Sequence, residues 1–151
     1  MAREIWPNET YEWPNISLGL ILGCRSITAP RENAHPNEHQ REQDRRTHHA
    51  KGPTRLMQII ITEAAHLIWV LRCERVIRGE IHSDREIKSR WLRAINARLT
   101  DDKITATKIK REEQFKYLVK ATWEPTLRKQ GEIPENWLND REVLVGRRTR
   151  G

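Results

Sequence analysis

The stretch QIIITEAAHLIWVLRCERVI, residues 58–77, is the most apolar part of the chain and decides its fold. Apolar residues here recur at the i, i+3, i+4, i+7 spacing of one helix face. They are Met57, Ile60, Ile61, Ala64, Leu67, Ile68 and Leu71. Three arginines occupy the last turns, where cations oppose the negative end of the helix dipole, and Gly79 follows as a suitable stop. The pattern predicts one long helix that begins after Pro53.

This predicted helix is not expected to span a membrane. A spanning helix needs about twenty mostly apolar residues, whereas this stretch contains side chains that are costly in lipid. They are Glu63, His66, Arg72, Glu74 and Arg75. The broad apolar arc favours instead a central helix packed by neighbours on two sides. His66 and Cys73 lie two turns apart, roughly 10 Å, too far to share a zinc ion. We interpret them as a core histidine and a buried thiol.

Two further helices are predicted downstream. Ser83 and Glu86 have the spacing of a capping box, which predicts a helix start at Ser83. The apolar stripe of this helix is Ile87, Trp91, Leu92, Ile95 and Leu99, with Arg90, Arg93 and Asn96 facing away. Residues 100–102 interrupt the pattern. A third helix is expected from about residue 112 to 129, with a kink or restart at Pro125 because proline lacks an amide donor.

Composition divides the 151 residues into four parts. Residues 1–24 are a Trp/Pro segment with a short apolar element at 16–22, either a helix capped by Asn15 or a buried strand. Residues 25–54 are polar and predict a mobile linker. Residues 55–136 form the helical domain, and residues 137–151 a basic tail. The predicted fold is mainly α, a small bundle of about three helices with a long mobile loop and a loosely attached N-terminal piece.

The charge balance suits an acidic partner such as nucleic acid. The formal net charge is +7, with 32% charged and 36% hydrophobic residues. The N-terminus lacks the apolar core of a secretory signal, and the two cysteines are interpreted as reduced thiols. The expected location is intracellular, nuclear or cytoplasmic.

The best metal candidate combines Cys24 with His35 and His39, because H-x3-H is a spacing found in zinc fingers. Only one cysteine is available there, and Pro36 inside the spacer opposes a helix. A solvated histidine-rich loop is therefore the preferred interpretation, and neither a metal nor another cofactor is predicted.

Catalytic patterns do not emerge from the sequence. Asp101 and Asp102 form an acidic pair like that of polymerases, but they follow a predicted helix rather than apolar strands, so helix capping or dipole stabilisation explains them better. Phosphate-binding glycine loops, nucleophile elbows and HExxH motifs are missing from the sequence. We predict that this chain is not an enzyme.

A set of basic residues nominates a nucleic-acid surface, with Trp91 and Trp123 near it in sequence to stack on bases. The set comprises Arg90, Arg93, Lys108, Lys110, Arg111 and Lys116. The alternative is that these lysines and arginines cover solvated faces and that the tryptophans belong to the core.

Several phrases resemble one family. WPNISLGLILGC, ITEAAHLIWVLRCERVI, EIKSRWLRAINARLT and TWEPTLRKQGEIPENWLNDREVLVG are similar to the C-terminal tails of reverse-transcriptase-like open reading frames of non-LTR retroelements in fungal genomes. The resemblance covers nearly the whole chain outside residues 25–54. It implies polymerase and often ribonuclease H domains upstream in a parent polyprotein, whose acidic metal-binding motifs have no counterpart here.

Two functions follow as hypotheses. The first is a non-catalytic accessory segment, a remnant of such a polyprotein, that binds RNA or DNA non-specifically and contacts the upstream domains. The second is a helical protein–protein interaction module without a nucleic-acid role.

Overall fold

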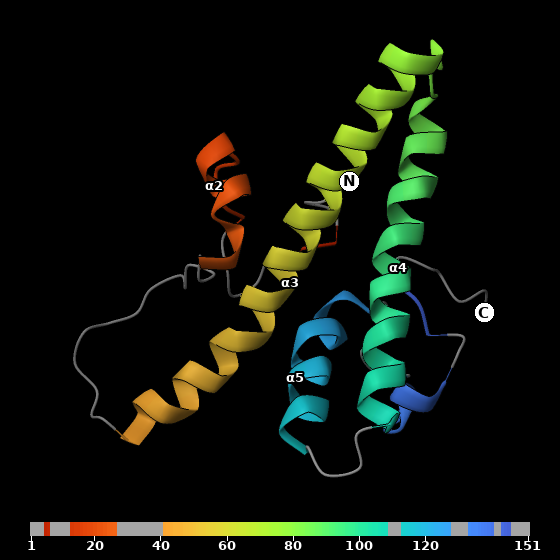
Figure 1. Cartoon of the computed structure of the whole chain (residues 1–151). Helices are drawn as coiled ribbons and strands as arrows, with labels where there is room; N and C mark the ends of the chain where they lie inside the picture. Colours follow the sequence, from red (N-terminus) through yellow and green to blue (C-terminus); the bar gives the residue numbers. More distant parts are fainter. Residues whose placement is uncertain are drawn as a thin grey trace.

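The chain folds into a helical bundle built around one long helix (Figure 1). The computed structural model describes residues 5–6, 13–26, 41–108, 113–127, 133–140 and 143–145. Within these ranges the regular structure is helical, without strands, which confirms the predicted mainly α fold. The principal helices are α3 (Arg41–Cys73), α4 (Asp84–Lys108) and α5 (Glu113–Trp123). A short helix, α2 (Leu18–Leu22), and the turn η1 (Cys24–Ser26) precede them.

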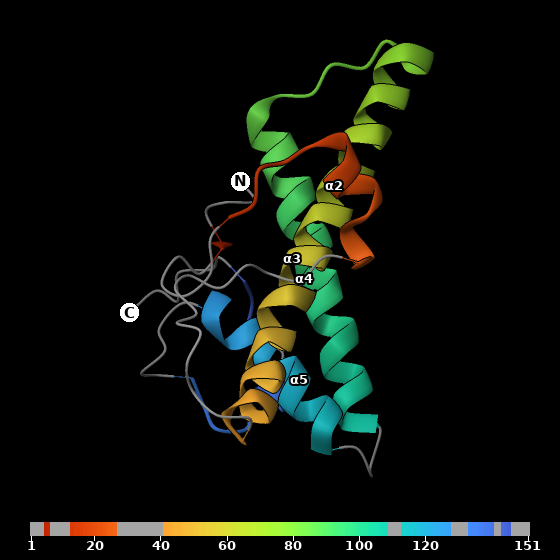
Figure 2. The same ribbon diagram turned by 90° about the vertical axis from the view of Figure 1, so that its left-hand side faces the viewer.

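Helices α3 and α4 form an antiparallel hairpin, and α5 packs against the half of it that lies far from the connecting turn (Figures 1 and 2). The π-helical turn η2 (Glu74–Arg78) ends α3, and Gly79 stops it with a left-handed φ of 70°, as predicted. The predicted cap at Ser83 is present, since its Oγ accepts from Glu86 N at 3.3 Å. Glu86 does not complete the box but pairs with His82.

The core is apolar and lies where α3, α4 and α5 meet. Its fully buried members include Leu56, Met57, Ile60, Ile95, Leu99, Val119 and Trp123. Trp137 of η4 (Trp137–Asn139) and Val145 pack back onto it, and Trp137 Nε1 donates to Glu124 Oε1 at 3.1 Å. Helix α5 ends at Trp123 and Pro125 lies in a 3-10 turn, η3 (Glu124–Thr126), so the break predicted at Pro125 is present. Leu127 is extended, so the helix does not continue beyond the break as expected.

The predicted start of the central helix is wrong. Helix α3 begins at Arg41 and runs through Pro53, so residues 41–54 of the expected linker are helical. Arginine, glutamate, glutamine and lysine are good helix formers even without an apolar face, and Gly52 and Pro53 are buried. Residues 27–40 lie outside the described ranges.

The other corrections concern tertiary contacts. Helix α4 continues through Thr100, Asp101 and Asp102, where an interruption was expected. The N-terminal piece is held more closely than expected, because Trp6 and Cys24 are buried in the core. The element at 16–22 is a helix rather than a strand, capped by Ser17 and not Asn15, with Ser17 Oγ accepting from Leu20 N at 3.1 Å.

Candidate functional site

Apolar side chains are exposed mainly on α2 and on the half of the hairpin that α5 does not cover. Of the ten large hydrophobic side chains exposed in the described ranges, eight lie there. They are Ile16, Leu18, Leu22, Ile68, Trp69, Val76, Ile77 and Ile81, which we call the apolar face. Large apolar patches exposed on a monomer mark contact sites for proteins or membranes.

The apolar face corrects the expectation that α3 is packed along its whole length. Ile68, expected in the core arc, is 65% exposed, and Trp69 is 62% exposed. His66, expected to be buried, is exposed beside Trp69 with the ring centroids 6.2 Å apart. Cys73 is half-buried.

The span Lys51–Arg78 is long and apolar enough to cross a membrane, and only 22% of its most apolar window is buried. Core helices of soluble proteins can have the same length and composition, so these two properties are weak support for a membrane role.

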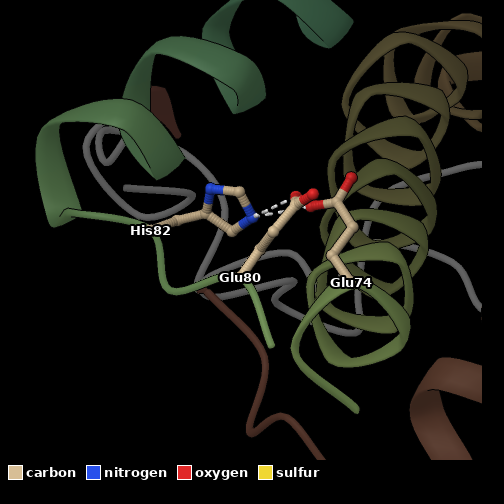
Figure 3. A group of neighbouring side chains, drawn as sticks. All are labelled: Glu74, Glu80 and His82. Carbon is tan, nitrogen blue, oxygen red and sulfur yellow. Dashed lines mark ion pairs between the residues drawn. The ribbon is translucent and has the colours of Figure 1, made fainter. Parts of the chain in front are cut away.

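A cluster of charged side chains connects α3 and α4 at the turn of the hairpin. Figure 3 shows three of its members, Glu74, Glu80 and His82. Arg90 on α4 donates to both carboxylate oxygens of Glu74 at 2.7 and 2.9 Å. His82 lies between carboxylates, with Nε2 2.7 Å from Glu74 Oε2 and Nδ1 2.9 Å from Glu86 Oε1. The hydrogen bonds from Arg90, together with His82, lower the pKa of Glu74 to about 2. The cap at Ser83 and Glu86 was predicted from the sequence, but His82, which directly precedes the cap in the sequence and pairs with Glu74 and Glu86, was missed.

Glu74, Glu80 and His82 could each offer one ligand atom to a cation, and these atoms lie within 4.8 Å of one another. Both oxygens of Glu74 are already engaged by Arg90, whose guanidinium supplies the positive charge that a metal would bring. The arrangement is therefore better explained as a set of ion pairs that connects the end of α3 to α4 than as a metal centre. Of the predicted metal set, Cys24 is buried with Sγ 3.5 Å from Thr62 Oγ1, and His35 and His39 lie outside the described residues.

The described members of the predicted basic set do not form one surface. Arg90 is engaged with Glu74 near the start of α4, and Arg93 is exposed one turn later. Lys108 lies at the other end of α4, roughly 27 Å away at 1.5 Å per residue. Lys116 pairs with Glu113 at 2.9 Å. Lys110 and Arg111 lie outside the described residues.

The predicted stacking partners are also in the core. Trp91 is 2% exposed and Trp123 is fully buried, so neither offers a ring face to a base. The alternative interpretation, that these tryptophans belong to the core, is correct.

An open hollow of about 520 Å³ lies between the end of α4, α5 and the segment around η4. Its walls include Lys116, Lys120 and Tyr117, whose side chain is 49% exposed. Lys120 Nζ donates to the carbonyl of Glu135 at 3.3 Å. Two ammonium groups beside an accessible aromatic ring are a combination that can meet phosphates and a base, although Glu113 and Glu135 line the same hollow.

The predicted acidic pair has a structural role. Asp102 accepts from both guanidinium nitrogens of Arg55 at 2.6 and 2.7 Å and from Trp123 Nε1 at 2.6 Å. It thereby joins α3, α4 and α5 from the middle of a helix, so the expected capping role is wrong. A carboxylate held by three donors is not arranged to bind Mg²⁺.

No family model matches the sequence, and no curated protein or solved structure matches it.

Proposed function

We propose that this chain is a non-catalytic helical interaction module that contacts another polypeptide through its apolar face. The observation that carries the proposal is a group of exposed apolar side chains at the end of α3 and in the turn that connects it to α4: Ile68, Trp69, Val76, Ile77 and Ile81. Burying such side chains is the main favourable term in protein association, and large aromatic side chains often dominate it. The resemblance to retroelement tails would place the module beside the upstream domains of a parent polyprotein.

A photo-crosslinking amino acid tests this proposal directly. It replaces Trp69 in one variant of the full chain, and Tyr117 in a matched control, because both positions carry exposed aromatic side chains. After illumination in cells, we expect polypeptide adducts from position 69 and few from position 117. Adducts at neither position, or equally at both, would contradict the proposal.

The second candidate function is non-specific nucleic-acid binding at the hollow beside α5. The specific observation in its favour is that the exposed Tyr117 lines the same hollow as Lys116 and Lys120, in a chain with a net charge of +7. Binding through phosphates releases counterions, so the logarithm of the affinity should fall linearly with the logarithm of salt concentration.

Titration of the full chain with fluorescent single-stranded RNA and duplex DNA tests this function. We expect Lys116→Ala and Lys120→Ala together to weaken binding and reduce its salt dependence, and Tyr117→Ala to weaken binding to single strands most. Arg93→Ala, an exposed cation far from the hollow, is the matched control. If the parent chain binds neither RNA nor DNA at low salt, this candidate function is wrong.

A further inference from the structure

We propose that the occupant of the apolar face is a second copy of this chain, paired antiparallel along α3 about a two-fold axis between Trp69 and Arg72. This inference rests on the proposed function, because it names the polypeptide that the apolar face contacts. It is carried by the spacing of residues along α3, their charge and the exposed area.

The outward side of α3 and of the turn η2 that ends it carries a repeat of alternating four-residue and three-residue steps. Its positions are Gln58, Thr62, Ala65, Trp69, Arg72 and Val76. This average of 3.5 residues is the spacing of a seam along which two helices pack. The first two positions already contact the N-terminal segment, since Gln58 Nε2 donates to the carbonyl of Arg25 at 3.2 Å and Thr62 Oγ1 lies 3.5 Å from Cys24 Sγ. Helix α3 continues beyond α2 toward the hairpin turn (Figure 2).

The seam is self-complementary in one direction only. Antiparallel pairing about the proposed axis sets Trp69 against Arg72 of the other copy, and Ala65 against its Val76. An arginine over an indole ring is attracted by the negative ring face, and a small residue opposite a branched one allows close packing. Parallel pairing would set Arg72 against Arg72, where like charges repel.

The same axis also pairs the two ends of the apolar face. Val76 and Ile77 lie on one side of the axis, about 10 Å along α3 at 1.5 Å per residue. On the other side, α2 lies against α3 and exposes Leu18 and Leu22. Rotation by 180° brings the hairpin turn of each copy over α2 of the other, so both apolar ends become covered together.

The exposed area is large enough for a stable pair. The eight side chains of the apolar face are between 50% and 85% exposed. At roughly 60–120 Å² of apolar surface for each fully exposed large side chain, they offer on the order of 500 Å² of apolar area, and somewhat more than half of a typical interface is apolar. A standard protein interface buries about 800 Å² on each partner.

Sedimentation of the purified full chain across micromolar concentrations tests the pairing. We expect a shift from 17.9 kDa to twice that mass as concentration rises. Trp69→Glu should raise the dissociation constant at least tenfold, whereas Ile104→Glu, an exposed apolar residue elsewhere on α4, should leave it unchanged. Circular dichroism establishes that each variant keeps its helices.

Arg72→Gln separates the two directions of pairing, because it removes the charge from both copies. It should weaken an antiparallel dimer, because the cation over Trp69 is lost. Strengthening by Arg72→Gln would indicate parallel pairing, in which the repulsion between two Arg72 side chains is relieved, and would overturn the proposed geometry.

A monomer at all concentrations would overturn the dimer. If the crosslinker at position 69 still captures a different polypeptide, the proposed function stands without the dimer; if it captures nothing, both fail. Co-sedimentation with phosphatidylserine vesicles that Trp69→Glu abolishes would also overturn the dimer, because the face would then meet a lipid surface.

Discussion

Two buried tryptophans, Trp123 and Trp91, differ in whether their indole N–H groups have a hydrogen-bond acceptor. Trp123 donates its indole N–H to Asp102, whose carboxylate also holds Arg55. Trp91 is equally deep, but its Nε1 has no hydrogen-bond partner within the described part of the chain. An unpaired buried donor costs free energy, whereas a bond to a charged acceptor stabilises the fold.

Replacing each tryptophan by phenylalanine separates the contribution of the hydrogen bond from that of apolar packing. Both substitutions remove a similar apolar volume, so the difference between them reports the hydrogen bond. We expect Trp123→Phe to lower the free energy of unfolding by about 1–3 kcal/mol more than Trp91→Phe does. Urea denaturation of both variants measures this difference. Equal losses would mean that the bond from Trp123 to Asp102 contributes nothing.

Glu74 makes the stability of the hairpin turn dependent on pH. Its pKa is lowered from 4.5 to about 2, so the unfolded chain binds this proton more readily than the folded one. The stabilisation is therefore fully present above about pH 4.5 and is lost as the pH falls toward 2. Thermal unfolding between pH 2 and 6 should show a smaller pH dependence for Glu74→Gln than for the parent. The same pH dependence in both proteins would mean that the ion pairs of Glu74 do not stabilise the fold.

At the scale of helices, one glycine sets the distance between α3 and α5. A Cβ placed on Gly52 would lie 2.5 Å from the carbonyl oxygen of Ala121, closer than real contacts allow. The obstruction is backbone rather than a flexible side chain, so one helix would have to move.

Gly52→Ala should therefore lower the free energy of unfolding by about 1–3 kcal/mol, the usual cost of overpacking. Gly19→Ala in α2 is the control, because its Cβ would meet only Ser17 Oγ at 3.8 Å. In a helix, that change is neutral or stabilising by up to about 1 kcal/mol. Guanidinium denaturation compares the two, and an unperturbed Gly52→Ala would mean that α3 and α5 separate easily.

The elements were predictable from sequence where local chemistry determines them. The apolar repeat of α3, the cap at Ser83, the stop at Gly79 and the break at Pro125 all depend on neighbouring residues. The uninterrupted course of α4 was not predictable, because Asp102 is compensated by Arg55, 47 positions earlier in the chain.

At the scale of the whole molecule, local patterns could not say which apolar residues would find partners. The periodicity placed Ile60 and Ile68 on the same arc, yet Ile60 is fully buried and Ile68 is exposed. What separates them is how far α5 and α2 reach along α3, which depends on tertiary packing. For the same reason, Arg90 and Lys108 of the predicted basic set lie near opposite ends of α4.

The C-terminal segment is held to α4 by hydrogen bonds between side chains of α4 and backbone groups of the segment. Asn96 Oδ1 accepts from Val145 N at 2.8 Å while its Nδ2 lies 3.4 Å from the Val145 carbonyl, and the Lys103 ammonium donates to the carbonyl of Asp140. Burial lowers the pKa of Lys103. The core is therefore complete only when Trp137 and Val145 have packed against it. During synthesis α3, α4 and α5 leave the ribosome before these residues do, so the packed end of the bundle finishes folding only after the three helices have emerged.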